Sequence, residues 1–66
     1  MENRIKELRL DFGITQQELA DKVSVSSRTI ISLEKQQYNP SVLLAYRISS
    51  VFHLPIEKVF IFDEED

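Results

Sequence analysis

The stretch from Gln16 to Lys35 constrains this fold most, because it contains two short helical patterns, each with its own cap. Thr15 precedes the first pattern and Glu18 follows three residues later, which is the spacing of a capping box. Ser26 precedes the second pattern. The apolar positions of the two patterns can all face one interior; they are Leu19, Ala20, Val23, Val25, Ile30 and Leu33. The stretch therefore predicts two helices joined by a tight turn.

The side chains left on the outer face of these helices carry amide, hydroxyl, cationic and apolar groups. They are Gln16, Gln17, Ser27, Arg28, Ile31, Ser32 and Lys35. This mixture suits the base edges and phosphates of DNA better than it suits plain solvation.

Length and composition exclude several classes of protein. A chain of 66 residues forms one small domain, which buries only about 60 % of its unfolded surface and gains from self-association. It has no cysteine and one histidine, so we expect no disulfide, no metal site and no cofactor. The sequence contains no nucleophile–base pair and no glycine-rich phosphate loop, so nothing in it indicates an enzyme. Without a signal peptide or a long apolar run, we expect a cytoplasmic protein that does not enter membranes.

The acidic residues are concentrated at the end of the chain. Four of the eleven acids are the last four residues, so residues 1–62 carry eight bases against seven acids, although the whole chain has a net charge of −3. We therefore divide the chain into a domain over 1–62 and an acidic tail over 63–66. The tail is expected to be a frayed terminus, but it could instead repel DNA from the wrong face or bind a basic partner.

A further helix precedes the central pair. Asn3 can cap a helix that runs to about Phe12, with Ile5, Leu8 and Phe12 on its inner face. Gly13 ends this helix, since glycine readily adopts the left-handed conformation.

Two more helices follow the central pair. Residues 36–40 form a loop, because the residue before a proline avoids the helical region. Ser41 caps a helix to about Phe52, whose inward residues are Leu44, Ala45, Ile48 and Phe52. Pro55 opens a short fifth helix, and residues 59–62 read as a buried turn that passes into an extended stretch. The expected fold is all-α, with five helices and a short C-terminal extended segment.

Five short motifs occur in order along the chain: Arg4-Ile5-Lys6-Glu7-Leu8-Arg9, Thr15-Gln16-x-Glu18-Leu19-Ala20, Val25-Ser26-x-x-Thr29-Ile30, Glu34-Lys35 and Tyr38-Asn39-Pro40-Ser41. In this order and spacing the chain resembles the phage-repressor and Cro type of helix-turn-helix protein, the XRE family, from residue 3 to about residue 60. The resemblance implies a compact all-helical domain, usually a dimer, that binds operator DNA.

Three residues of the motif have alternative interpretations. Gln16 starts a helix, where N–H groups favour a phosphate, but it could be a solvated surface glutamine. Arg28 can donate to guanine O6 and N7, or it contacts a phosphate or forms a surface ion pair. Ile31 suits a thymine methyl group, or it shares in the core. The full set expected to contact DNA is Gln16, Gln17, Ser26, Ser27, Arg28, Ile31, Ser32, Lys35, Gln37, Tyr38 and Asn39.

The resemblance has further implications. It implies a salt bridge between Arg9 and Glu34 that orients the second helix of the motif. Family members often have glycine where this chain has Ser24, Gln36 and His53. Either these turns adopt other geometries, or each costs roughly 1 kcal/mol or more of stability. His53 is expected to be a surface turn residue, with a pH-sensitive contact as the alternative.

The C-terminus holds more apolar groups than a short chain can bury. We expect Val59 and Phe60 to turn inward and the others to form a homodimer interface; these are Leu54, Ile56, Ile61 and Phe62. The sequence therefore predicts a dimeric regulator, acting as a repressor on a palindromic operator, with no small-molecule ligand. An antitoxin or adaptor that binds another protein is the alternative.

Overall fold

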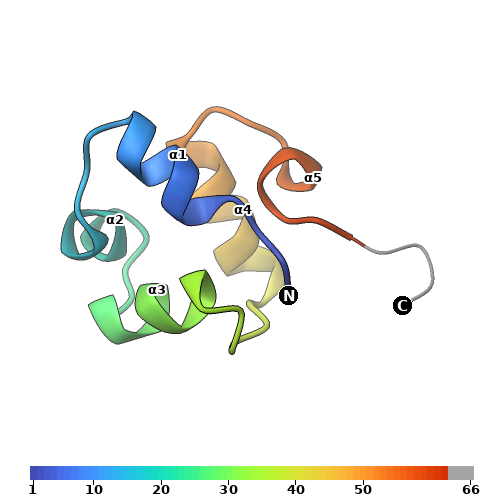
Figure 1. The fold of residues 1–66 in the computed structure, drawn as a ribbon, viewed down its shortest axis with the longest axis horizontal. Helices are drawn as coiled ribbons and strands as arrows, with labels where there is room; N and C mark the ends of the chain where they lie inside the picture. Colours follow the sequence, from blue (N-terminus) through green and yellow to red (C-terminus); the bar gives the residue numbers. More distant parts are fainter. Residues whose placement is uncertain (63–66) are drawn as a thin grey trace.

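The computed structural model describes residues 1–62, which form five helices. In chain order they are α1 (Ile5–Asp11), α2 (Gln16–Lys22), α3 (Ser27–Glu34), α4 (Val42–Val51) and α5 (Ile56–Val59). Figure 1 shows α2 and α3 at one end of the molecule and α5 at the other, with α1 and α4 between them. The predicted all-α class is confirmed, and the first, third and fourth helices each end one residue earlier than expected.

Side-chain caps start three of the helices where the sequence predicts them. The predicted cap of the first helix is wrong by one residue, since Arg4 is the N-cap of α1, although Asn3 Oδ1 accepts from Ile5 N at 3.1 Å. Thr15 Oγ1 accepts a hydrogen bond from Glu18 N at 3.0 Å, and Glu18 Oε1 accepts one from Thr15 N at 2.8 Å. These bonds to Thr15 hold the pKa of the Glu18 carboxyl below its ordinary value, because they stabilise the charged form. Ser26 and Ser41 cap α3 and α4 by accepting from backbone N–H groups. Pro55 is itself the N-cap of α5 and precedes its first residue.

Four helices end in the same left-handed turn. Gly13, Ser24, Gln36 and His53 have φ values of 69°, 62°, 62° and 56° and follow the C-caps of α1 to α4. The next N–H donates to a carbonyl five residues back, as in Ile14 to Arg9 at 3.1 Å, which is the Schellman arrangement. The three non-glycine turns therefore keep the geometry that favours glycine, at a cost of about 1–2 kcal/mol each.

The residue after each of these turns is usually apolar. Ile14, Val25 and Leu54 are partly buried and pack against the core, the contact that often accompanies a Schellman turn. The sequence alternatives are thus resolved: this chain keeps the turns, and after Ser24 and His53 it buries part of the following side chain, Val25 or Leu54, against the core.

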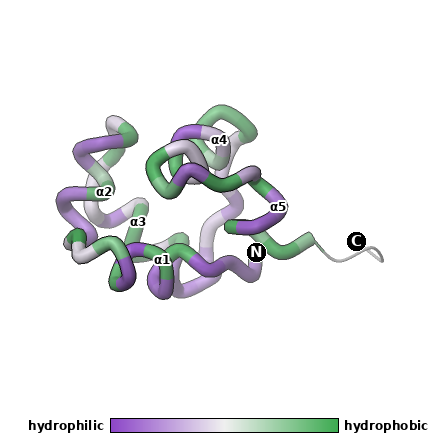
Figure 2. Tube along the Cα trace, turned by 90° about the horizontal axis from the view of Figure 1, so that it is seen from above, coloured by the Kyte–Doolittle hydropathy of each residue, from purple (hydrophilic) through white to green (hydrophobic). Residues whose placement is uncertain are grey.

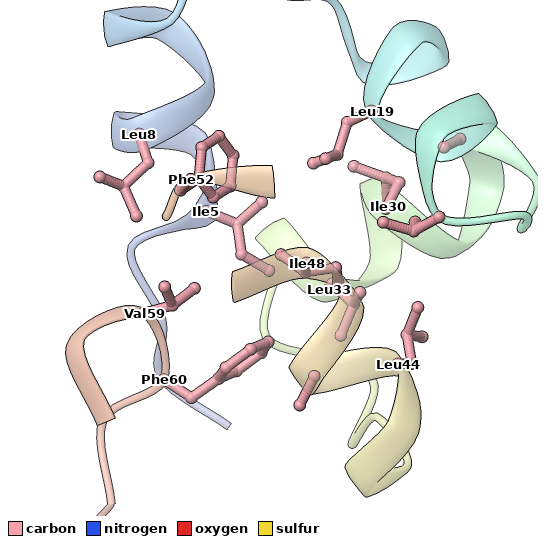
Figure 3. Packing of buried hydrophobic residues seen from close by; sticks show 13 residues of the cluster. Ile5, Leu8, Leu19, Ile30, Leu33, Leu44, Ile48, Phe52, Val59 and Phe60 are labelled. Carbon is pink, nitrogen blue, oxygen red and sulfur yellow. The ribbon is translucent and has the colours of Figure 1, made fainter. Parts of the chain in front are cut away.

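One buried cluster joins all five helices (Figure 3). It consists of Ile5, Leu8, Leu19, Ala20, Val23, Ile30, Leu33, Leu44, Ala45, Ile48, Phe52, Val59 and Phe60. The inward positions predicted for α4 are confirmed, as are those of Val59 and Phe60.

The inward position predicted for Phe12 is wrong. Its side chain is 49 % exposed, and its ring meets that of Phe52 edge to face, with centroids 5.1 Å apart. Phe12 is the C-cap of α1, at the margin of the core, so the neighbouring ring covers it only in part. The buried side chains of α1 are Ile5, Leu8 and Arg9.

The two ends of the described chain lie side by side. Asn3 and Phe60 form an antiparallel bridge. Arg4 N donates to Val59 O at 2.8 Å, and Ile61 N donates to Glu2 O at 2.9 Å. The expected C-terminal extended segment is therefore present, and it is paired with the segment before α1.

Candidate nucleic-acid interface

The helix-turn-helix unit is formed by α2, the turn at Ser24 and α3. Leu19 of α2 and Ile30 of α3 are both fully buried and lie close together in the core (Figure 3). Because Ile30 and Leu33 fix one side of α3 on the core, its opposite side faces solvent.

The outer face of α3 carries one exposed cation in its first turn. Arg28 is exposed and has no acidic partner within ion-pair distance among residues 1–62. Ile31 lies one turn further along and is partly exposed. Within the described chain, it is not among the partly buried apolar side chains that pack against the core. Arg28 and Ile31 can therefore both contact a partner on this side.

Several of the polar side chains selected from the sequence hold local structure. Ser26 Oγ accepts from Thr29 N at 3.4 Å and caps α3. Gln17 Nε2 donates to Asp21 Oδ1 at 2.8 Å. Gln16 Nε2 donates to Glu34 Oε1 at 3.1 Å, a contact that neither interpretation of Gln16 anticipates. Ser27 and Ser32 are partly exposed.

Arg9 and Glu34 form a bidentate ion pair between α1 and α3. Arg9 Nε lies 2.8 Å from Glu34 Oε2, and its second nitrogen donates to Oε1 at 3.3 Å. The remaining nitrogen donates to Ile14 O at 3.0 Å. The two side chains are only 10 % and 6 % exposed. The pair neutralises an acid at the end of α3, where an uncompensated carboxylate would repel a phosphate.

The loop after α3 continues the outer face. Lys35, Gln37, Tyr38 and Asn39 are all exposed, and Pro40 ends the loop before α4. Gln36 turns the chain with its positive φ, so these four side chains follow directly from the end of the helix. The loop thus offers an ammonium, two amides and a phenol beside the end of α3.

Sequence reasoning missed a cation beside the start of α2. Lys6 is exposed and lines an open hollow of about 520 Å³ together with Arg9, Thr15 and Gln16. Lys6 and Arg9 are three residues apart on α1 and share one helix face. The implied bond from Arg9 to Glu34 could therefore have indicated Lys6 as well.

An apolar groove lies on another face of the molecule. It has a volume of about 230 Å³ and is lined by Met1, Pro40, Ser41, Val42, Ala45, Ile56, Phe60 and Phe62. Val42 is 81 % exposed, Phe62 57 % and Ile61 44 %. Figure 2 shows that the segment before the grey trace is hydrophobic and extends away from the body. Leu54 and Ile56, which the sequence also predicts at the interface, are partly buried against the core.

Other features bear on function less directly. His53 is an exposed turn residue, as expected. No helix within residues 1–62 is long and apolar enough to cross a membrane, and no group of three or more potential ligands in that range could hold a metal ion. The acidic tail over 63–66 lies outside the described residues.

Sequence comparison places the chain among transcriptional regulators. The helix-turn-helix family model matches residues 5–59. An HTH-type transcriptional regulator of Archaeoglobus fulgidus is 56 % identical over 66 residues, which cover the whole of this chain and 93 % of the relative. The HTH-type transcriptional regulator YgzD of Bacillus subtilis is 42 % identical over 66 residues, the full length of both chains.

Solved structures share this fold. The N-terminal DNA-binding domain of SinR from Bacillus subtilis superposes with a TM-score of 0.79 at 26 % identity, covering 96 % of this chain and 91 % of that domain. The restriction-modification controller protein C.AhdI from Aeromonas hydrophila gives a TM-score of 0.77 at 22 % identity, covering 83 % of each chain. With its capped helix pair and its match over residues 5–59, the chain belongs to the helix-turn-helix family of DNA-binding transcriptional regulators.

Proposed function

We propose that the protein binds operator DNA as a homodimer, places α3 of each copy in the major groove of a palindromic site, and represses by occlusion. The observation that carries this proposal is the division of α3 into two faces. Ile30 and Leu33 hold the helix on the core, while Arg28 and Ile31 remain open to a partner on the other side.

Base recognition is assigned to the outer face of α3. Arg28 donates to O6 and N7 of a guanine, because its guanidinium presents two parallel donors. Ile31 contacts a thymine methyl group one turn further along. Ser27 and Ser32 bond to bases or phosphates and discriminate little between sequences.

Contacts to the DNA backbone are assigned to the start of α2 and to both ends of α3. After α3, phosphates are held by Lys35, Gln37, Tyr38 and Asn39. At the starts of the helices, they are held by Gln16 and Gln17 in the first turn of α2 and by Ser26, the N-cap of α3. Gln16 gives one amide N–H to Glu34 and has a second N–H for a phosphate.

The dimer contact is assigned to the apolar groove, with Ile61 and Phe62. In a two-fold contact the same surface meets itself, so the exposed Phe62 of one copy can fill the groove beside Val42 of the other. Leu54 and Ile56 add their remaining exposed surface. Such a dimer sets two recognition helices about 34 Å apart, one turn of DNA.

The proposed DNA partner implies where the protein acts and how it is controlled. We place the protein in the cytoplasm and assign it no catalytic activity, no cofactor and no small-molecule ligand. Control then comes from the concentration of the protein itself or from a protein partner.

Selection of bound sites from random double-stranded DNA, followed by gel shift, tests the proposal. We expect inverted repeats whose half-site centres lie one helical turn apart. Recovery of unrelated sequences, bound no better than random DNA, would reject sequence-specific binding and favour the antitoxin or adaptor alternative.

A further inference from the structure

The segment before α1 connects two parts of the molecule that the proposed function uses separately. It runs between the end of α3 and the C-terminal extended segment (Figure 1). On one side, Arg4 N donates to Val59 O and Ile61 N donates to Glu2 O, and these two bonds flank the antiparallel bridge between Asn3 and Phe60. That pairing lies directly before Phe62 and so adjoins the proposed dimer contact.

Asn3 makes the connection to α3. Its Nδ2 donates to Leu33 O at 2.8 Å and to Met1 O at 3.1 Å, and its Oδ1 accepts from Ile5 N at 3.1 Å. Leu33 lies in the last turn of α3, and its side chain is fully buried. The side chain of Asn3 thus bonds to the starting N–H of α1 and to a terminal carbonyl of α3 at once.

The bond to Leu33 fixes the end of α3 and the start of the following loop together. Leu33 O also accepts from Gln36 N at 3.0 Å, in the left-handed turn that leads to Gln37, Tyr38 and Asn39. At the next residue of the helix, Glu34 is held by Arg9. Asn3 and Arg9 are therefore two independent restraints on the same helix turn, and only Asn3 also belongs to the segment paired with Phe60.

We propose that Asn3 is a positioning residue that sets the placement of α3 relative to the dimer contact, and thereby the half-site spacing that the dimer accepts; this inference rests on the proposed function. Asn3 alone links the C-terminal extended segment to the end of α3 in this way: its backbone pairs with Phe60, and its side chain bonds to Leu33. With this bond the two recognition helices of a dimer keep one separation. Without it, the core packing of Leu33 and the Arg9–Glu34 pair still hold α3, but its last turn loses its direct bond to the segment paired with Phe60, and the separation is held less closely.

The test measures spacing preference. Gel shifts compare operators whose half-sites lie at the selected spacing or one base pair closer or farther, since one base pair rotates a half-site by about a tenth of a turn. The unmodified protein should prefer one spacing by about tenfold or more, a difference of about 1.4 kcal/mol. For Asn3→Ala the preference should fall below about threefold, while the affinity for an isolated half-site changes less than about twofold.

Matched variants separate positioning from folding. Glu2→Gln changes an exposed neighbour in the same segment and should keep the full preference. Asn3→Asp keeps the oxygen that accepts from Ile5 N, and it replaces the donor to Leu33 O and Met1 O by an oxygen that both carbonyls repel, so it should keep the start of α1 and lose the preference. If either Asn3 variant binds all spacings more weakly by the same factor, Asn3 is only structural and the proposal is wrong.

Two further outcomes are distinguishable. If the unmodified protein itself shows no spacing preference, the proposed dimer on a palindrome fails, and this inference fails with it. Should both Asn3 variants fail to fold, hydrogen exchange on the unmodified protein decides. Slow exchange of the Asn3 side-chain amide supports its bond to Leu33 O in solution, and exchange as fast as that of the exposed Gln37 amide overturns the proposal.

Discussion

Arg9 and Glu34 are joined by two nitrogen–oxygen contacts of 2.8 and 3.3 Å in a nearly buried position between α1 and α3. Gln16 donates to the same carboxylate at 3.1 Å, so three helices meet at one acid. Because burial removes most of the competing water, loss of one partner leaves an uncompensated charge.

A double-mutant cycle on unfolding tests this pair. Arg9→Ala or Glu34→Ala should each destabilise the fold by about 3 kcal/mol. The double variant should be more stable than the sum of the single effects predicts, with a coupling of at least about 1 kcal/mol. The exposed pair Arg4–Glu7, at 3.3 Å, is the control, and its coupling should stay below about 0.5 kcal/mol. Equal coupling energies for the two pairs would contradict this account.

A second prediction concerns base reading by Arg28. Arg28→Ala should cost about 1–3 kcal/mol on the specific site and relax the preference at one base pair. Lys35→Ala, assigned to a phosphate, should weaken binding to all sequences alike and lower the salt dependence. Gel shifts on specific and random DNA at several salt concentrations measure both effects. If Arg28→Ala weakens both kinds of DNA equally, Arg28 contacts a phosphate.

The left-handed turns predict that replacing a strained residue by glycine stabilises the fold. His53→Gly should raise the free energy of unfolding by about 1 kcal/mol, because glycine adopts a positive φ without steric cost. For a domain of this size that corresponds to about 4–8 °C in Tm. Ser50→Gly, three residues earlier on the exposed side of α4, is the control and should lower stability by about 0.5–1 kcal/mol. Thermal unfolding of both variants gives the sign of the change in stability. A lower stability of His53→Gly would show that the turn at His53 is not strained.

The capping box predicts a loss of stability in acid. The pKa of Glu18 is lowered in the folded protein. Its contribution to the free energy of unfolding is therefore fully present above the unfolded pKa near 4.3, and it disappears as the pH falls through the lower folded pKa. Glu18→Gln cannot titrate, and its Tm should depend less on pH between about pH 5 and pH 3. Thermal melts across this range compare the two proteins. Parallel curves would show that other carboxylates account for the acid sensitivity.

The apolar groove predicts the effect of a single charge on assembly. Phe62→Glu places a carboxylate at the proposed two-fold contact and should yield a monomer that binds a palindrome far more weakly. Ile61→Glu should act in the same way. Leu10→Glu, an exposed apolar residue outside the groove, should leave the assembly unchanged. Sedimentation measures the mass, and an unmodified protein that is monomeric at tens of micromolar, free and on its operator, would refute the dimer.

Local signals in the sequence predict much of this fold. Thr15 and Gly13 mark helix boundaries through bonds to residues nearby, so a pattern a few residues long is sufficient. The pairing of Asn3 with Phe60 could not be predicted, because helical periodicity carries no information about contacts between distant segments. For the same reason the sequence does not connect Gln16 with Glu34. Phe12 has the spacing of an inward residue, but it is the C-cap of α1 at the margin of the core.

The pairing of Asn3 with Phe60 also orders events during folding. Contacts between α2 and α3 close short loops, whereas the bridge between the two ends closes nearly the whole chain and carries a larger entropic cost. We therefore expect the recognition helix to form early and to reach its final position last, after residue 60 has been synthesised. In kinetic terms, Val59→Ala should speed unfolding and leave the folding rate almost unchanged, and Leu19→Ala should slow folding.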